Sequence, residues 1–423
     1  MKKYLYGFFF PLLLFTQDLE VRLPTQGNLP PLYLSSLGGA EEMRAVLEFD
    51  LSASGRCIVL PRQEDLEKNA LSFSLANWKR AHIPYCVTGR MEGGKLELTV
   101  YQIDQGTVKK YPNIPLERKA VHKLADQLQK DLFGRDGIAR FQLIYTERRR
   151  NLSKEGLDFL SEIWIADYDG ANAKQVTSEN SYCLSPGFLP HSCSEFYYAS
   201  EKTGQTKLYK ASLSHPIGEP LLDLRGNQAL PSISKDGKQI AFISDVAGRP
   251  DLFIQDLENG KIKGKAKQLF SYPRATQATP TYSPDGKQIA FVSDKDGPPR
   301  IYVLAVSQKK SKTLPQPKLL TKKNRENTSP AWSPDGTKLA YSAKVDSFRQ
   351  IWIYDFLTGE EIALTTGPEN KENPSWAPDS FHLIYNTETN DHSELYLIHL
   401  NRKEPILVGK SIYQRRFASW QLF

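Results

Sequence analysis

A short stretch that recurs four times in the C-terminal half constrains the fold more than any other feature of the chain. Its clearest form is PTYSPDGKQIAFVSD, residues 280–294. The other copies begin at Pro231, Pro330 and Pro374, so that the first prolines are 49, 50 and 44 residues apart. A fixed period of this length indicates a fold built from structural repeats, and it outranks any local interpretation.

Each period has room for four short strands. The central Ser283–Gly286 is turn chemistry, because Pro284 presets φ and Gly286 tolerates a positive φ. The β-type runs on either side, Thr279–Tyr282 and Gln288–Val292, therefore predict a hairpin. Third and fourth apolar runs follow in every period, at 252–257 and 266–270, 301–306 and 317–321, 351–356 and 361–365, 395–400 and 404–408. Four strands in 44–50 residues is the size of a propeller blade.

Counting the strands predicts how the ring closes. Weaker runs occur in two sets upstream, at 142–146, 163–168 and 173–177 and at 196–200, 208–213 and 219–224, and they bring the second-to-fourth set to six copies. The opening strand has only five internal copies, which begin at 186, 231, 280, 330 and 374. The missing sixth copy is Phe417–Trp420, so the C-terminal strand is expected to complete the first of six blades and to remove two exposed sheet edges. The alternative is a frayed tail.

The N-terminal third has a different character and suggests separate units. A basic Met1–Lys3 followed by an apolar run, Tyr4–Phe15, is too short to span a membrane and is typical of an export signal. A retained anchor or a buried N-terminal strand are the alternatives. We therefore predict a signal peptide over residues 1–17, with an uncertain cleavage site, and a mobile, Pro- and Gly-containing segment over 18–31. An α/β domain is predicted over 32–135 and the six-bladed β-propeller over 136–423.

Helical and strand patterns alternate within residues 32–135. Helices are expected at 40–51, 71–80 and 116–133, the last ending at Gly134. Residues 64–70 form either a loop or a short helix. Strands are expected at 57–60, 84–88, 95–103 and 107–111.

Charge and cysteine content exclude some functions. The formal net charge of +7 is mild, and the one tight basic cluster, Arg148–Arg150, is interpreted as a solvated loop rather than a nucleic-acid site. The four cysteines form no Cys-x-x-Cys motif, which argues against zinc or thioredoxin chemistry. In an exported chain, Cys57 could pair with Cys86 and Cys183 with Cys193, or all four could be buried thiols.

No motif predicts catalysis. The chain lacks Gly-x-Ser-x-Gly, His-Glu-x-x-His and a phosphate loop. The repeated aspartates, Asp236, Asp285, Asp335 and Asp379, lie in separate turns without the acidic loop that calcium needs, and we interpret them as turn formers. We therefore expect no catalytic residue, cofactor or metal ligand.

The remaining candidate site is a surface. Loops between blades converge at the ends of a propeller channel, where they can bind a protein or a small ligand. Polar residues rich in side-chain amides stand just before the opening prolines: Asn227, Gln228, Gln277, Thr279, Asn327, Thr328, Glu372 and Asn373. The alternative is that asparagine and threonine simply suit loops.

The combined pattern resembles the TolB family of the Tol–Pal envelope system along nearly the whole chain. Glu162–Gly170 (EIWIADYDG) is close to the family's Ser-Asp-Tyr-Asp-Gly, and the Pro-x-Trp-Ser-Pro-Asp-Gly repeats and the Phe-Ala-Ser-Trp ending also match. The segment Glu20-Val21-Arg22-Leu23 looks like the family's N-terminal segment. One departure is Asn227, where the family often has histidine.

The resemblance implies a non-enzymatic periplasmic scaffold that supports outer-membrane integrity and constriction during cell division. Such proteins bind the peptidoglycan-associated lipoprotein, Pal, at one mouth of the channel, which assigns the pre-proline residues to that contact. Their N-terminal segment, here Glu20–Leu23, is a switch that also contacts TolA. A monomer outside its complex is expected, with no nucleic-acid partner and no membrane span in the mature chain. The alternatives are a glycan- or peptide-binding propeller and an accessory domain of a hydrolase.

Overall fold

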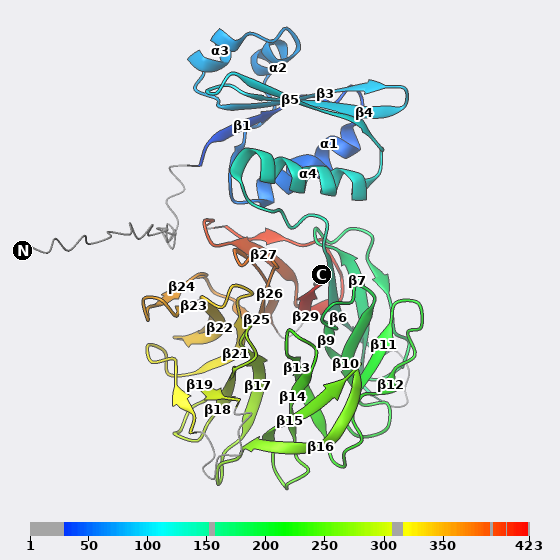
Figure 1. Ribbon diagram of the computed structural model, residues 1–423, viewed down its shortest axis with the longest axis vertical. Coiled ribbons are helices and arrows are strands. Elements are labelled where there is room, and N and C mark those ends of the chain that lie inside the picture. The colour runs from blue at the N-terminus through cyan, green and yellow to red at the C-terminus, as the bar shows by residue number, and fades with distance from the viewer. Residues whose placement is uncertain (1–28, 152–156, 307–315, 390–391, 403, 422–423) are drawn as a thin grey trace, which may run out of the picture.

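The computed structural model describes residues 29–151, 157–306, 316–389, 392–402 and 404–421. They form a small α/β domain stacked on one end of a β-propeller (Figure 1). The expected signal peptide and the segment Glu20–Leu23 lie outside the described residues. Within those residues, no helix combines the length and the apolar character that crossing a bilayer would require.

The N-terminal domain is a five-stranded sheet with helices on both faces. The strands are β1 (Pro31–Leu34), β2 (Ile58–Val59), β3 (Tyr85–Glu92), β4 (Lys95–Gln102) and β5 (Thr107–Ile114), in the order β2-β1-β3-β4-β5. The helices are α1 (Glu41–Ala53), α2 (Glu64–Leu71), α3 (Leu75–Arg80) and α4 (Arg118–Phe133). Helices α1 and α4 lie between the sheet and the propeller, whereas α2 and α3 cover the far face (Figure 1).

The sequence did not predict strand β1, which lies between β2 and β3 in this sheet. β1 pairs in parallel with both β2 and β3, and Leu32, Tyr33 and Leu34 have no exposed surface. Leu32 and Leu34 pack toward α1 and α4, and Tyr33 packs toward Trp78 on the other face. A strand buried on both faces shows no polar alternation, so these four residues gave no periodic signal.

The helices agree with the expectation except at one point. The stretch expected as one helix, 71–80, is divided, because α2 ends at Leu71 and α3 begins at Leu75. The ambiguous residues 64–70 belong to α2. Helix α4 ends as predicted, with Gly134 at φ +67° and its amide N–H donating to the carbonyl of Lys130 at 2.9 Å.

The described residues after α4 form six four-stranded sheets, as predicted. The first blade contains β29 (Gln414–Trp420), β6 (Gln142–Arg150), β7 (Phe159–Asp167) and β8 (Lys174–Gln175). The second and third blades contain β9 (Cys183–Phe188), β10 (Glu195–Ser200), β11 (Lys207–Ser212), β12 (Glu219–Pro220), β13 (Gln228–Ile233), β14 (Gln239–Ser244), β15 (Asp251–Glu258) and β16 (Lys261–Phe270). The fourth, fifth and sixth contain β17 (Gln277–Tyr282), β18 (Gln288–Ser293), β19 (Arg300–Ala305), β20 (Lys318–Leu319), β21 (Asn327–Trp332), β22 (Lys338–Val345), β23 (Phe348–Asp355), β24 (Glu361–Ala363), β25 (Asn370–Trp376), β26 (His382–Glu388), β27 (Leu395–His399) and β28 (Ile406–Leu407).

The C-terminal strand closes the ring. Strand β29 pairs antiparallel with β6, and Ser419 lies opposite Ile144 and Trp420 opposite Leu143. The Trp420 side chain is 1% exposed, and its indole N–H donates to the carbonyl of Ser375 in the sixth blade at 3.2 Å. This confirms the predicted closure and rules out a frayed end at Trp420.

The repeated turn uses its aspartate locally. The Ser283 hydroxyl donates to Asp285 Oδ1 at 2.6 Å, and the Lys287 N–H donates to the same oxygen at 3.1 Å. These bonds lower the pKa of Asp285, the Ser283 contact most strongly. Because the carboxylate is held by its own turn, the interpretation of these aspartates as turn formers stands.

The structure decides between the alternatives left open for the cysteines and corrects the expectation for Arg148–Arg150. None of the four cysteines is bridged, and Cys193 is exposed while the other three are buried. Burial raises the pKa of Cys57 and of Cys86 to about 12, which favours the protonated thiol over the nucleophilic thiolate. The cluster Arg148–Arg150 ends strand β6 rather than a loop, and Arg149 lies over the rings of Trp164 and Tyr413.

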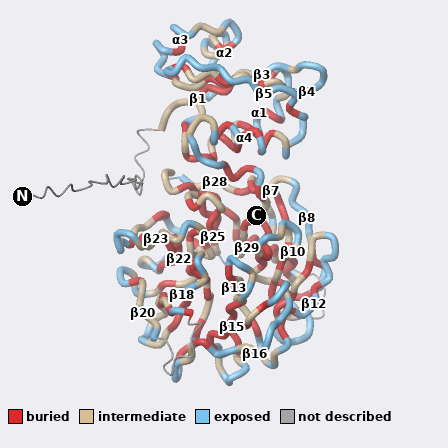
Figure 2. Tube along the Cα trace, in the orientation of Figure 1, coloured by how far each residue is buried: buried red, intermediate tan, exposed pale blue. Residues whose placement is uncertain are grey.

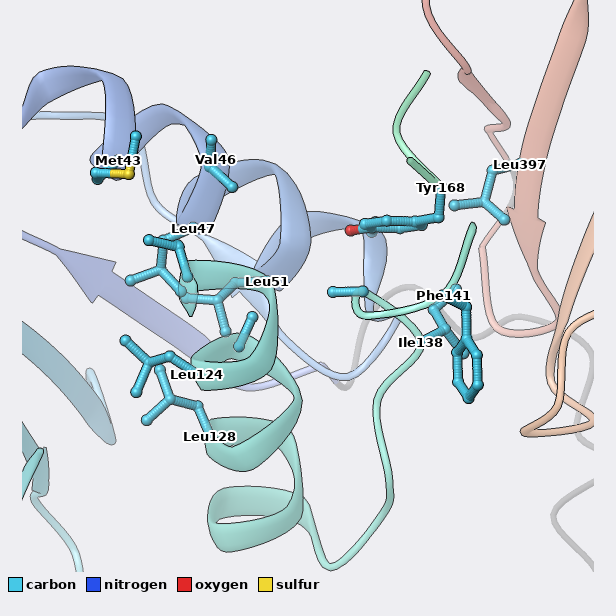
Figure 3. Packing of buried hydrophobic residues seen from close by; sticks show 14 of the residues in the cluster. Met43, Val46, Leu47, Leu51, Leu124, Leu128, Ile138, Phe141, Tyr168 and Leu397 are labelled. Carbon is cyan, nitrogen blue, oxygen red and sulfur yellow. The ribbon is translucent and has the colours of Figure 1, made fainter. Parts of the chain in front are cut away.

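The two domains share one hydrophobic core. Met43, Leu47 and Leu51 of α1 and Leu124 and Leu128 of α4 belong to the same buried cluster as Tyr168 and Leu397 of the propeller (Figure 3). Buried residues therefore continue from the helices into the first and sixth blades (Figure 2). An interface with a continuous apolar core fixes the relative position of two domains more firmly than a polar one.

Candidate functional site

The innermost strand of every blade carries a β-bulge at the equivalent position along the strand. In each, one residue adopts a positive φ, between +39° and +53°, just before the proline, or before Ala418 in β29: Ser185, Leu230, Thr279, Ser329, Asn373 and Phe417. The pairing register with the second strand shifts at that point in all six blades. Proline cannot donate to the ladder, and a bulge is a position where a sheet tolerates it.

This geometry corrects the expected position of the polar residues. Only Asn227 precedes its innermost strand, because β13, β17 and β21 already begin at Gln228, Gln277 and Asn327. Glu372 and Asn373 lie within β25. The prolines therefore lie within the strands rather than at their beginnings. A hairpin pattern read from proline onward misses the half-strand before the bulge.

The six bulges together surround a narrow cavity of about 180 Å³ in the channel. Every blade contributes, and the lining consists of Ser185, Pro186, Tyr197, Leu230, Pro231, Thr279, Pro280, Ser329, Pro330, Asn373, Pro374, Phe417, Ala418 and Ser419. Of the predicted site residues, Thr279 and Asn373 belong to this lining. Asn373 also links two blades, because its Oδ1 accepts from the Ser329 hydroxyl at 3.1 Å.

Three of the predicted residues are buried instead. Gln228, Gln277 and Asn327 are each no more than 1% exposed. The Gln228 amide donates to the carbonyl of Leu224 at 2.7 Å, and the Asn327 amide donates to the carbonyl of Asn324 at 2.9 Å. Gln228 and Asn327 therefore hold connections between blades, whereas neither side-chain polar atom of Gln277 has a hydrogen-bond partner among the described residues.

The other predicted residues lie at the rim. Arg349 connects two of them, because its guanidinium lies 3.2 Å from Thr328 Oγ1 and 3.4 Å from Glu372 Oε1. It also pairs with Glu326 at 3.4 Å. Asn227 is exposed, and its side-chain amide donates to Asp245 Oδ2 at 2.6 Å.

Sequence reasoning missed Arg349. It lies at the start of β23, the third strand of its blade, about 20 residues from the motif that defined the candidates. The connection between second and third strands reaches the same end of the blade as the connection from the preceding blade. A search of these strand starts for charged residues could have found it.

The opposite end of the channel holds a larger cavity of about 380 Å³ lined by prolines and aromatic rings. Aromatic residues at a mouth would favour a glycan- or peptide-binding propeller. However, Trp376 and Tyr282 are only 4% and 6% exposed. The Trp376 indole N–H donates to the carbonyl of Ala331 at 3.0 Å, so this ring mainly joins neighbouring blades.

Comparison with known proteins identifies the family of this chain. Residues 130–423 match the family described as the TolB beta propeller domain. The chain belongs to the TolB family. A TolB homologue from Protochlamydia amoebophila is 39% identical over 387 residues, which cover 84% of this chain and 81% of the relative. A TolB homologue from Chlamydia pneumoniae is 36% identical over 416 residues, covering 96% and 90%.

The fold is shared with a solved TolB structure. The crystal structure of TolB from Acinetobacter baumannii superposes with a TM-score of 0.76 at 24% sequence identity. The match covers 95% of this chain and 98% of that one. The N-terminal α/β domain and the propeller are therefore both part of the TolB architecture.

In this TolB-family chain, a polar cluster crosses the domain boundary beside the shared core. His122 Nδ1 lies 2.8 Å from Asp50 Oδ2, and the Tyr168 hydroxyl donates to Asp50 Oδ1 at 2.6 Å. Three potential cation ligands lie within 4.8 Å of one another: His122, Asp167 and Asp169. Arg118 already pairs with Asp169, so an ion pair between the domains accounts for this carboxylate.

Proposed function

We propose that this protein is a non-enzymatic periplasmic scaffold of the Tol–Pal system and that it binds the peptidoglycan-associated lipoprotein at the narrow mouth of its propeller. Membership of the TolB family supports the system and the compartment. In the same proposal, the N-terminal segment containing Glu20–Leu23 contacts TolA. Lipoprotein binding would shift that segment between docked and free states by differential affinity.

One observation carries the choice of mouth. Six bulges bring residues that are up to 232 positions apart, from Ser185 to Phe417, into one ring around the narrow cavity. Such a ring exists only in the closed propeller. A partner that contacts this ring therefore binds a surface formed by several blades rather than one continuous segment of the chain.

The chemistry of the rim suits a protein partner. Asn227, Thr328, Glu372 and Asn373 offer hydrogen-bond donors and acceptors, and Arg349 is 22% exposed between two glutamates. Arginine at a partly covered position is a frequent source of interface energy. We assign Gln228, Gln277 and Asn327 a supporting role beneath this rim.

Calorimetry with the soluble domain of the lipoprotein from the same organism tests the proposal. Arg349→Ala and Glu372→Ala should each weaken binding about tenfold or more, because each removes one member of the rim cluster. Lys287→Ala is a matched control, since this exposed lysine lies in the Asp285 turn at the opposite end of its blade. Absence of binding by the wild-type protein, or equal effects of all three variants, would refute the proposal.

A further inference from the structure

One position breaks the sixfold pattern of the channel. Tyr197 on β10 faces Gly187 on the innermost strand β9. The equivalent pairs in the other blades combine a small or aliphatic residue with a small one: Ala241 and Ser232, Ala290 and Thr281, Ala340 and Ala331, Ile384 and Ser375, Ile144 and Ser419. The second blade alone therefore combines an aromatic ring with a glycine among these six pairs.

The glycine makes room for the ring. A Cβ atom on Gly187 would lie 2.4 Å from the Tyr197 hydroxyl oxygen and 2.5 Å from its Cζ. Real Cβ atoms do not approach other atoms so closely, so any larger residue would displace the ring. Gly187 does not have a positive φ, and the close approach is therefore the reason for glycine at this position.

The ring stands between the two cavities of the channel. Tyr197 and Ser419 are the two residues that line both the narrow cavity at the bulges and the larger aromatic cavity. Ser419 is small, whereas Tyr197 carries a full phenol. Tyr197 therefore has the larger of the two side chains that lie between the cavities.

We propose that Tyr197 closes the channel and forms the aromatic floor of the partner-binding mouth, where it contacts an apolar side chain inserted by a loop of the partner. This inference rests on the proposed function and names a specificity-determining residue for it. A central aromatic surrounded by a polar rim is the usual arrangement of an interface hot spot.

The size of the cavity limits what can enter. Its volume of about 180 Å³ is below the roughly 300–1,000 Å³ typical of small-molecule sites. One side chain fits above Tyr197, but an extended strand cannot thread past the ring. We therefore expect the partner to insert a single side chain from a protruding loop.

A double-mutant cycle tests the inference. Tyr197→Ala should weaken binding of the lipoprotein domain at least tenfold, because the floor is lost. Gly187→Ala should have a similar effect, because its new methyl group displaces the ring. The double variant should bind no more weakly than Tyr197→Ala, since without the ring the methyl group has nothing to displace.

Controls separate the floor from general damage. Tyr197→Phe keeps the ring and should bind within about twofold of the wild type, whereas Tyr197→Leu should lose affinity even if Tyr197→Ala folds poorly. Thr281→Ala alters only the larger cavity and should not change affinity. Thermal unfolding of each variant confirms that it is folded.

The outcomes distinguish the two proposals. If the wild-type protein does not bind the lipoprotein domain, the proposed function fails. If it binds and responds to Arg349→Ala but not to Tyr197→Ala, only the floor is wrong. Additive losses from Gly187→Ala and Tyr197→Ala would likewise overturn the inference.

Discussion

The first blade and the other five have the same four-stranded sheet but are assembled differently. Each of the others is one continuous segment of chain. In the first blade, β29 and β6 pair residues about 275 positions apart, such as Ser419 and Ile144. The first blade also carries Tyr168 and Asp169, which contact the N-terminal domain. The comparison shows that the blade that closes the ring also contributes to the domain junction, which it shares with the sixth blade.

Removing residues 416–423 should have the largest effect, because it deletes most of β29, exposes an edge of β6 and removes Trp420 from its contact with the sixth blade. We expect a loss of more than about 5 kcal/mol in the free energy of unfolding. Urea denaturation measures this loss, with a chain ending at Gln421 as the control. Cooperative unfolding at wild-type denaturant concentrations would show that the ring does not depend on its closing strand.

Trp420→Ala should be the next largest change. This side chain is 1% exposed, so the cavity left behind should cost about 3–5 kcal/mol. Trp332 holds the equivalent place in the fifth blade but is only partly buried, stacked on Phe356 at 4.7 Å. Trp332→Ala should therefore reduce the free energy of unfolding by less, as measured by denaturant titration. Equal losses would contradict the greater contribution of the first blade to stability.

Tyr168→Phe tests the link between the first blade and the N-terminal domain. It leaves the buried Asp50 without one hydrogen bond, which should cost about 1–3 kcal/mol. Tyr385 is a matched control, because it is equally buried and its hydroxyl has no hydrogen-bond partner among the described residues. Tyr385→Phe should be nearly neutral in the same thermal unfolding assay, and similar losses would argue against the interdomain bond.

The smallest predicted effect concerns pH and the linker into the first blade. Asp126 accepts hydrogen bonds from the Ala139 and Arg140 N–H groups, but burial raises its pKa to about 6. This exceeds the unfolded value of about 3.9, so its contribution to stability is complete below pH 4 and is lost as pH rises through about 6.

Asp126→Asn removes that titration. The wild type should lose on the order of 1 kcal/mol relative to the variant between pH 4 and pH 6. Unfolding free energies measured at several pH values check the difference. Parallel pH profiles for the two proteins would show that Asp126 does not titrate in this range.

Local patterns predicted the repeating part well because its information is local. The Ser283–Gly286 turn and its flanking β-type runs are complete within 15 residues, and the strand count implied a closing strand at Trp420. The N-terminal domain was predicted less completely. β1 has only four residues, and its burial depends on neighbours contributed by Ile58–Val59 and Tyr85–Val87.

The candidate site was predicted only in part for a similar reason. The motif located the ring of residues before the prolines, but it could not show which side chains point inward. Gln228 is buried and Asn373 lines the channel, although both stand shortly before the proline of an innermost strand. Arg349 and Tyr197 come from other strands of their blades, and sequence spacing alone does not connect them with the ring.

By itself, the sequence determined the repeating unit, the number of blades and the closure of the ring, because turn chemistry and strand periodicity act over a few residues. Only the tertiary structure decided which side chains meet at the mouth and where the domains join. Those contacts depend on bulges that rotate the chain and on burial between distant segments, such as Tyr197 over Gly187 and Tyr168 against Asp50. No local pattern encodes the direction of a side chain after a bulge or the identity of its distant neighbour.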